Sequence, residues 1–253
     1  MKSICYDVHH AIARRWFLAA LIATTVALYL SVGQATYGLI GYLESYELFE
    51  ENSFGYSMTD MLTMGMKGDF GLLTLPALSA LPFAAQALHE IKSGAIRPAV
   101  FRTGRKNWII GKVAGCVISG MLLQGAAVGL LFLILNGLMR GYAGQWFPWG
   151  DGGDFWPILL RRMLCGGIWA GVGCVIALAT ETASAAYLAP LCLCYALMMI
   201  GTRFFPDAMM LNPMQWVSGA TWFLTIVLAF TLALQALFLK RGAQKYVYKD
   251  GFQ

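Results

Sequence analysis

The chain has 253 residues, of which 58% are hydrophobic and only 12% carry a formal charge, with a net charge of +5. A typical soluble domain has about 25% charged residues, because polar side chains must cover much of the surface that meets water. The composition therefore excludes a soluble enzyme, a nucleic-acid-binding domain and a disordered chain. It indicates a polytopic membrane protein.

Six nearly uncharged runs are long enough to cross a bilayer. A transmembrane helix needs about 20 mostly apolar residues, and no strand-like alternation competes with these runs. We therefore predict an all-α fold in which residues 1–253 form a single transmembrane domain with about six helices. The predicted spans are residues 16–33, 70–88, 113–139, 156–180, 183–202 and 220–239.

The distribution of basic residues predicts the orientation, because Lys and Arg near span ends stay in the cytoplasm. With both termini cytoplasmic, 13 of the 18 basic residues lie inside and nine of the 13 acids lie outside. The inside residues are Lys2, Arg14, Arg15, Lys92, Arg97, Arg102, Arg105, Lys106, Lys112, Lys240, Arg241, Lys245 and Lys249. We thus expect a multi-pass protein of the cell membrane whose basic excess contacts membrane lipids and not nucleic acid.

Residues 1–15 predict an amphipathic helix at the cytoplasmic interface. Ile4, Val8, Ile12 and Trp16 recur every four residues, and polar side chains occupy another side. Two roles remain open for this helix. It is either a plain interfacial anchor or an elbow that packs against a cytoplasmic partner.

The cytoplasmic loop 89–106 contains the breaks that define a short helix. Gly94 can end the helix that leaves the membrane, Pro98 suits the first turn of a new helix, and Gly104 can end that helix. The spacing predicts a helix over 97–103 across the cytoplasmic end of the spans. The remaining residues, 240–253, are expected to form a cytoplasmic tail.

The same loop resembles the ABC-2 type permease family. Glu90 is followed by Gly94 after three residues and by Arg102 after seven more, and Lys112 stands at the foot of the next span with Trp108 shortly before it. The six spans, the cytoplasmic termini, the amphipathic start and the large loop after the first span also agree. The resemblance therefore covers essentially the whole chain.

The resemblance implies a half-transporter whose short cytoplasmic helix, the coupling helix, inserts into a separate ATPase. The residues it assigns to coupling are Glu90, Gly94, Arg97, Phe101 and Arg102. The implied partners are two copies of an ABC ATPase and a second permease copy or paralogue, which meets the first and fifth spans. The other interpretation of these residues is a positive-inside connector with helix caps.

The sequence contains neither an ATP-binding motif nor a group of residues typical of a catalytic site. No G-x-x-x-x-G-K-[ST] sequence occurs, so ATP and Mg are expected on the partner ATPase and no cofactor on this chain. The three histidines lie near the cytoplasmic boundary, and no span carries a carboxylate pair. We therefore expect neither an enzyme nor a metal site.

Two outer segments are candidates for contact with cargo or with the exit path. Residues 34–69 combine acids with aromatics, which suits either a solvated interfacial helix or attraction of a cationic amphiphile. Residues 204–216 are apolar yet broken by Pro206 and Pro213. In the resembled family this region re-enters the membrane from outside, so we expect a re-entrant segment between spans five and six.

Arg161 and Arg162 are the most unusual charges, since they fall one to two turns inside the fourth span. They either extend to the outer head groups, or line an outer vestibule or pair with Asp151, Asp154 or Asp207. The two alternatives stay open at this level.

The resemblance implies the permease subunit of an ATP-driven ABC exporter, expected to move a peptide or hydrophobic small molecule outward. The alternatives are an ion-coupled carrier or channel, and an immunity or anchoring subunit that moves no substrate.

Overall fold

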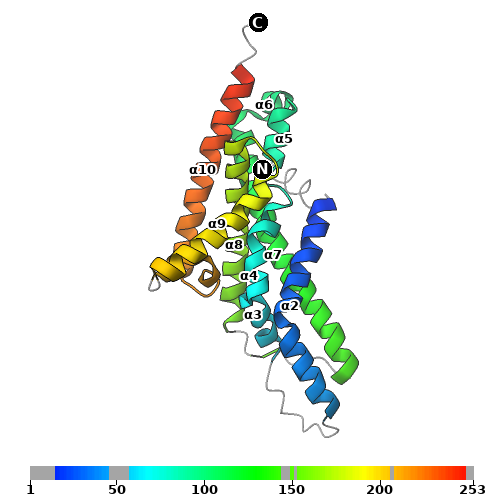
Figure 1. Ribbon diagram of the computed structural model, residues 1–253. Coiled ribbons are helices and arrows are strands. Elements are labelled where there is room, and N and C mark those ends of the chain that lie inside the picture. The colour runs from blue at the N-terminus through cyan, green and yellow to red at the C-terminus, as the bar shows by residue number, and fades with distance from the viewer. Residues whose placement is uncertain (1–14, 46–56, 144–148, 151–152, 206–207, 249–253) are drawn as a thin grey trace.

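The computed structural model describes residues 15–45, 57–143, 149–150, 153–205 and 208–248. The predicted interfacial helix therefore lies outside the described residues except for Arg15. Within these ranges the chain is helical and contains no strand, which confirms the all-α class (Figure 1). The elements are α2 (Arg15–Ser45), α3 (Met58–Lys67), α4 (Asp69–Ala80), α5 (Gln86–Lys92), α6 (Ile96–Thr103), α7 (Arg105–Ala143), α8 (Phe155–Thr180), α9 (Ala185–Phe204), η1 (Met209–Leu211), η2 (Pro213–Gln215) and α10 (Thr221–Tyr248).

Five of the described helices contain stretches long and apolar enough to cross a membrane. They are Arg15–Gly33, Arg105–Leu138, Phe155–Thr180, Ala185–Phe204 and Thr221–Gln244. They match the predicted first, third, fourth, fifth and sixth spans, and they fit a multi-pass membrane protein.

The predicted second span, 70–88, is not one continuous helix. Helices α4 and α5 are separated by a turn over 81–85. Leu81 donates its backbone N–H to the carbonyl of Leu78 at 3.3 Å, and Pro82 has no N–H to continue the helical pattern. Leucine, proline, phenylalanine and alanine keep this stretch apolar, so hydropathy alone did not reveal the break.

Several helices extend beyond the predicted span ends. Helix α7 begins at Arg105 and not at 113, α2 continues to Ser45 inside the predicted loop 34–69, and α10 continues to Tyr248 inside the predicted tail. An apolar run in the sequence identifies only the part of a helix that is compatible with the hydrocarbon core of the bilayer. The backbone hydrogen bonds of the helix continue through polar residues as well.

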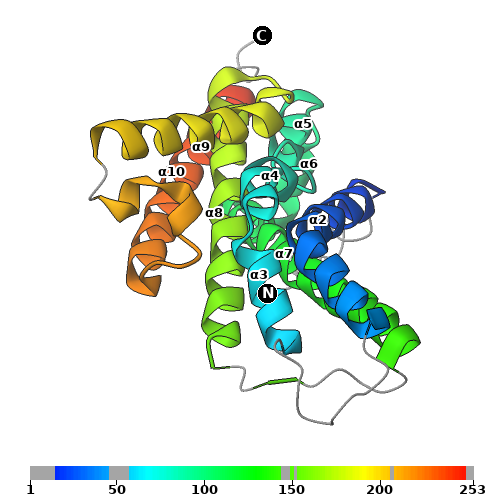
Figure 2. The same ribbon diagram turned by 60° about the horizontal axis from the view of Figure 1, so that its bottom comes forward.

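Helix α8 is the central element of the bundle. It packs against α7, α10, α4 and α9, and Figure 2 shows it between the α9–α10 side and the α4–α7 side. Glycine allows the closest approach: a Cβ atom on Gly120 of α7 would lie 2.5 Å from the Gly166 carbonyl of α8. The two backbones are therefore in contact, as small residues permit between membrane helices.

The two ends of the bundle differ. Helices α5 and α6 lie at one end with the last turns of α10, and α3 lies at the opposite end (Figure 1). We call these the α6 end and the α3 end. The described connection between α9 and α10 contains η1 and η2. From it Trp216, which is 8% exposed, stacks on Trp169 of α8 with ring centroids 5.7 Å apart.

Candidate functional site

The α6 end presents a short helix whose limits are set by two glycines. Gly94 and Gly104 have φ values of 75° and 78°, a backbone conformation that residues with a Cβ atom rarely adopt. Between them α6 covers Ile96–Thr103, close to the predicted 97–103. The predicted short helix is thus present in the structure.

Apolar packing holds α6 against the bundle. Ile96 is 0% exposed and belongs to a cluster that includes Ile91 of α5, Trp108 of α7 and Ala243 of α10. Val100 packs against the same cluster. A helix of eight residues is unstable alone, so this packing supplies its order.

The opposite side of α6 faces solvent. Phe101 is 87% exposed, the most exposed of the large apolar side chains of the described chain. Arg97 and Arg102 are exposed on the same helix. The structure therefore places an apolar ring near two cations on a helix fixed at the end of the bundle.

Glu90 has a different environment from the other four predicted coupling residues. Its Oε1 accepts a hydrogen bond from Nζ of Lys112 at 2.7 Å and another from Nε2 of Gln86 at 3.0 Å. Lys112 is only 4% exposed, and its Nζ lies 5.6 Å from the ring centroid of Phe83. The carboxylate thus connects α5 to the first turns of α7.

Two further contacts join this end to the rest of the bundle. Nζ of Lys92 donates to the backbone carbonyl of Glu181, just after α8, at 2.5 Å. Nη2 of Arg105 donates to the backbone carbonyl of Lys240 in α10 at 2.8 Å. The segments on either side of α6 are therefore hydrogen-bonded to the end of α8 and to α10.

Arg162 lies inside the bundle. Its side chain is 0% exposed, and its guanidinium donates to Oε1 of Gln124, to the carbonyl of Met66 and to the carbonyl of Gly71 at 3.1, 2.7 and 3.0 Å. Gln124 in turn donates to the hydroxyl of Ser79 at 2.8 Å. One cation thus joins α3, α4, α7 and α8.

Arg161 is half-buried and contacts the start of α10. Its Nε donates to Oγ1 of Thr221 at 3.3 Å, and its Nη1 lies 3.4 Å from the Val217 carbonyl and 3.3 Å from the Ser218 carbonyl. Neither arginine forms an ion pair with an acid in the described part of the chain. Asp151 and Asp207, two of the acids considered as partners, lie outside the described residues.

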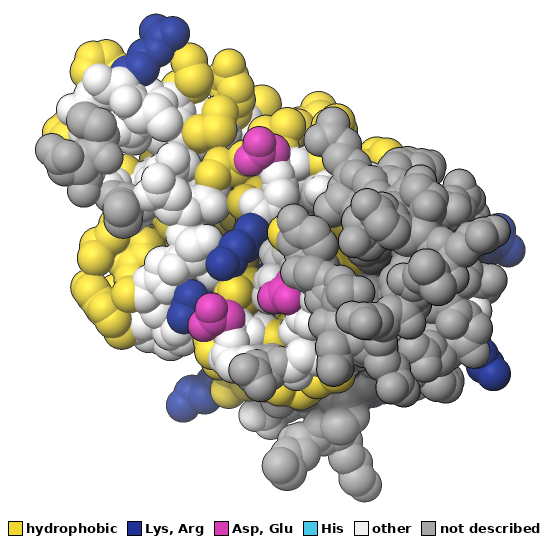
Figure 3. All heavy atoms as spheres, turned by 90° about the horizontal axis from the view of Figure 1, so that it is seen from below, with side chains coloured by type: hydrophobic (Ala, Val, Ile, Leu, Met, Phe, Trp, Pro, Cys, Tyr) yellow, Lys and Arg dark blue, Asp and Glu magenta, His cyan; other side chains and the backbone are white. Residues whose placement is uncertain are grey.

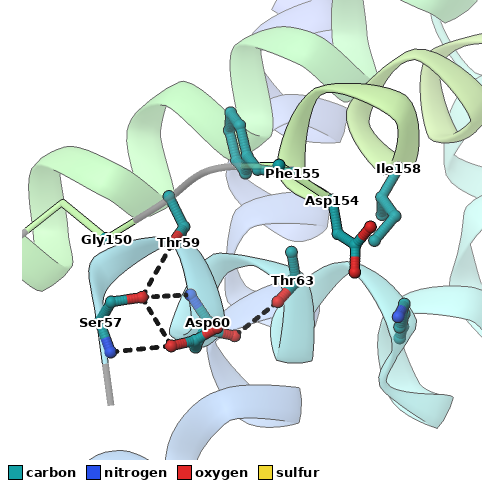
Figure 4. A pocket seen from close by; sticks show the side chains of 10 residues that line it. Ser57, Thr59, Asp60, Thr63, Gly150, Asp154, Phe155 and Ile158 are labelled. Atoms are coloured by element: carbon teal, nitrogen blue, oxygen red, sulfur yellow. Dashed lines mark hydrogen bonds between the residues drawn. The ribbon is translucent and has the colours of Figure 1, made fainter.

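A cavity of about 690 Å³ opens at the α3 end, between α3 and the start of α8 (Figure 4). Hydroxyls and a carboxylate gather on one wall: the hydroxyl of Ser57 bonds to Oδ2 of Asp60 at 2.6 Å and to Oγ1 of Thr59 at 2.8 Å. The side-chain and backbone hydrogen bonds from Ser57 lower the pKa of Asp60 below its usual value. These bonds form the N-terminal cap of α3, which accounts for the cluster without a ligand.

The α3 end combines both signs of charge. Lys67 and Asp154 line the same cavity as Asp60, and Figure 3 shows acidic and basic side chains close together on this face. Of the acids in the predicted outer loop, Glu44, Asp60 and Asp69 belong to described helices. Glu47, Glu50 and Glu51 lie outside the described residues.

Comparison with protein-family models, with curated proteins and with solved structures gives no match.

The polar residues that connect the helices were missed by the sequence analysis. Gln124 and Ser79 stand alone in apolar runs, and a lone amide or hydroxyl there was a usable signal for an interhelical contact. The Trp169–Trp216 stack carried no such signal, because tryptophan is common throughout this sequence.

Proposed function

We propose that the chain is the permease subunit of an ATP-driven exporter of the ABC-2 type, acting with a separate ABC ATPase. The observation that carries the proposal is α6. This helix is held to the bundle by buried Ile96 and presents the 87% exposed Phe101 outward, together with Arg97 and Arg102. An exposed aromatic near cations on an ordered helix is suited to a protein partner.

The contacts behind α6 support a mechanical role. Glu90 joins α5 to Lys112 of α7, and Lys92 and Arg105 reach the ends of α8 and α10. A force applied to α6 would reach three of the long helices through short polar contacts and packed side chains. No phosphate-binding loop occurs in this sequence, so the exporter proposal calls for an ATPase outside it.

The proposed topology has six membrane segments, with the broken α4–α5 pair as the second and both termini cytoplasmic. In it the α6 end faces the cytoplasm and the α3 end faces outward. The segment with η1 and η2 is the proposed re-entrant element. Its Trp216 reaches Trp169, which is 14 residues after Phe155 and so about 21 Å along α8.

The assembly follows from the half-transporter proposal: two permease chains and two ATPase subunits, with cargo moving outward between the permeases. A peptide or hydrophobic small molecule remains the proposed cargo. An ion-coupled carrier is the second candidate, since Arg162 is an ionisable residue inside a membrane helix. Its three acceptors are neutral oxygens that do not titrate, which favours a structural cation over a proton relay.

The exporter proposal is tested by purifying the tagged full-length chain from its native membrane in mild detergent. An ABC ATPase is expected to co-purify, and native mass measurement should give equal numbers of both subunits, two of each. ATP turnover of this complex should rise with the correct cargo. A chain that purifies without any ATPase and remains active as an ion carrier would contradict the proposal.

The topology predicts which residues react from outside the cell. A cysteine introduced at Ser53, in a background lacking accessible cysteines, should react with an impermeant maleimide in intact cells because residues 34–69 are expected to be external. A cysteine at Gln244 should react only after the membrane is opened. The reverse labelling pattern would show the opposite orientation.

A further inference from the structure

A second cavity lies beside the α9–α10 connection and has a different character from the one at α3. It encloses about 540 Å³ and is lined by Met210, Gln215, Trp216, Ser218, Gly219, Ala220 and Phe223. Its size is in the range of about 300–1,000 Å³ typical of ligand sites. We call it the Trp216 pocket.

Aromatic contacts hold one side of the pocket rigid. Trp216 is stacked on Trp169 of α8 and meets Phe223 edge-on, with ring centroids 5.9 Å apart. The indole Nε1 of Trp216 donates to the Met210 carbonyl at 2.8 Å, so the polar atom of the ring is satisfied within the protein. The ring therefore offers the cavity an apolar surface.

Two small residues also line the pocket. Gly219 and Ala220 lie just before α10 begins. The helix that follows exposes Trp222 and Ile226, which are apolar side chains suited to contact with lipid. An elongated apolar group could enter the pocket from the bilayer.

Arg161 does not line this pocket, but it contacts one of the residues that do. Nη1 of Arg161 lies 3.3 Å from the carbonyl of Ser218, one of the lining residues, and Nε contacts Thr221. These contacts use Nε and Nη1, and Nη2 takes part in none of them. All three acceptors are neutral, so within the described residues the charge of Arg161 is not matched by an anion.

The depth of Arg161 suits a lipid phosphate. It is six residues after Phe155, about 9 Å along α8. The exposed Trp156 and Trp222 occupy the adjoining turns of α8 and α10, and tryptophan is enriched at the membrane interface. An anionic head group at this level would lie near the guanidinium while its chain extends toward the pocket.

We propose that the Trp216 pocket binds an anionic phospholipid, with one acyl chain against Trp216 and the phosphate at Arg161. The apolar lining favours binding of the acyl chain, and the cation of Arg161, which has no anionic partner among the described residues, favours a negatively charged head group. This inference needs a membrane-embedded chain but does not depend on export or on an ATPase. Failure of either proposal would leave the other standing.

The test measures tryptophan fluorescence of the full-length chain in phosphatidylcholine nanodiscs that contain chain-brominated lipid. Bromine quenches indole fluorescence on contact. The contribution of Trp216 to the fluorescence is obtained by subtracting the emission of Trp216→Phe from that of the wild type. Brominated phosphatidylglycerol should reach half-quenching of that component at a lipid fraction about fivefold lower than brominated phosphatidylcholine. The component of exposed Trp222, obtained from Trp222→Phe, should be quenched equally by both lipids.

Three variants separate the parts of the site. Arg161→Gln should remove the preference for phosphatidylglycerol and keep the quenching, while Arg161→Lys should keep most of the preference because the charge remains. Ala220→Leu should reduce quenching of Trp216 by both lipids, since the added side chain fills the pocket.

Equal half-quenching fractions for the two lipids in wild type would overturn the proposal, as would a preference that survives Arg161→Gln. Quenching of Trp216 that appears only when the nanodiscs are diluted to one chain each would also overturn it. That result would show that a second copy of the chain covers the pocket.

Discussion

Replacing Arg162 with methionine is expected to lower the free energy of unfolding by about 3 kcal/mol, the largest effect among single substitutions considered for this chain. The guanidinium is fully buried and serves three acceptors from three other helices. Methionine keeps much of the volume but leaves Gln124 and the carbonyls of Met66 and Gly71 without their donor. Each buried acceptor left unpaired costs about 1 kcal/mol or more.

The measurement is unfolding of the purified chain in mixed micelles with increasing denaturing detergent, followed by tryptophan fluorescence. Arg161→Met is the matched control, since the same change at a half-buried position should lower stability by about 1 kcal/mol. Arg162→Lys should fall between wild type and Arg162→Met, because an ammonium group keeps the charge but lacks the planar fork that reaches several acceptors. Equal midpoints for Arg162→Met and wild type would show that the buried cation contributes nothing to stability.

Phe101→Ala is expected to weaken binding of the proposed ATPase about thirtyfold while leaving membrane insertion and expression at the wild-type level. The reason is geometric: the ring is 87% exposed on a helix whose order comes from Ile96 on the opposite side. Its removal therefore leaves the packing of α6 intact. Truncation of a central interface anchor commonly costs about 2 kcal/mol, which corresponds to the expected loss of affinity.

The readouts for Phe101→Ala are co-purification of the ATPase, ATP turnover and export. Phe230→Ala is the matched control, because Phe230 is also an exposed phenylalanine but lies on α10 and should face lipid in the proposed arrangement. That variant should retain all three activities. Wild-type association by Phe101→Ala would leave α6 as a positive-inside connector, the alternative interpretation of the loop.

The sequence by itself determined the class of this protein and most of its membrane segments. A long apolar run indicates that a helix is surrounded by hydrocarbon and not by water. Five of the six predicted runs coincide with long apolar helices. The limits of α6 were also predictable. Gly94 and Gly104 act locally, through backbone conformations that other residues disfavour, so no knowledge of the tertiary structure was needed.

Only the tertiary structure decided the roles of the charged residues. Arg161 and Arg162 are neighbours in sequence with the same chemistry, yet one contacts the start of α10 and the other is sealed among four helices. Successive residues on a helix point about 100° apart, and which direction is buried depends on the neighbours that pack there. The same holds for Glu90, whose partner Lys112 lies 22 residues away, across the turn and α6, and becomes a contact only when α5 packs beside α7.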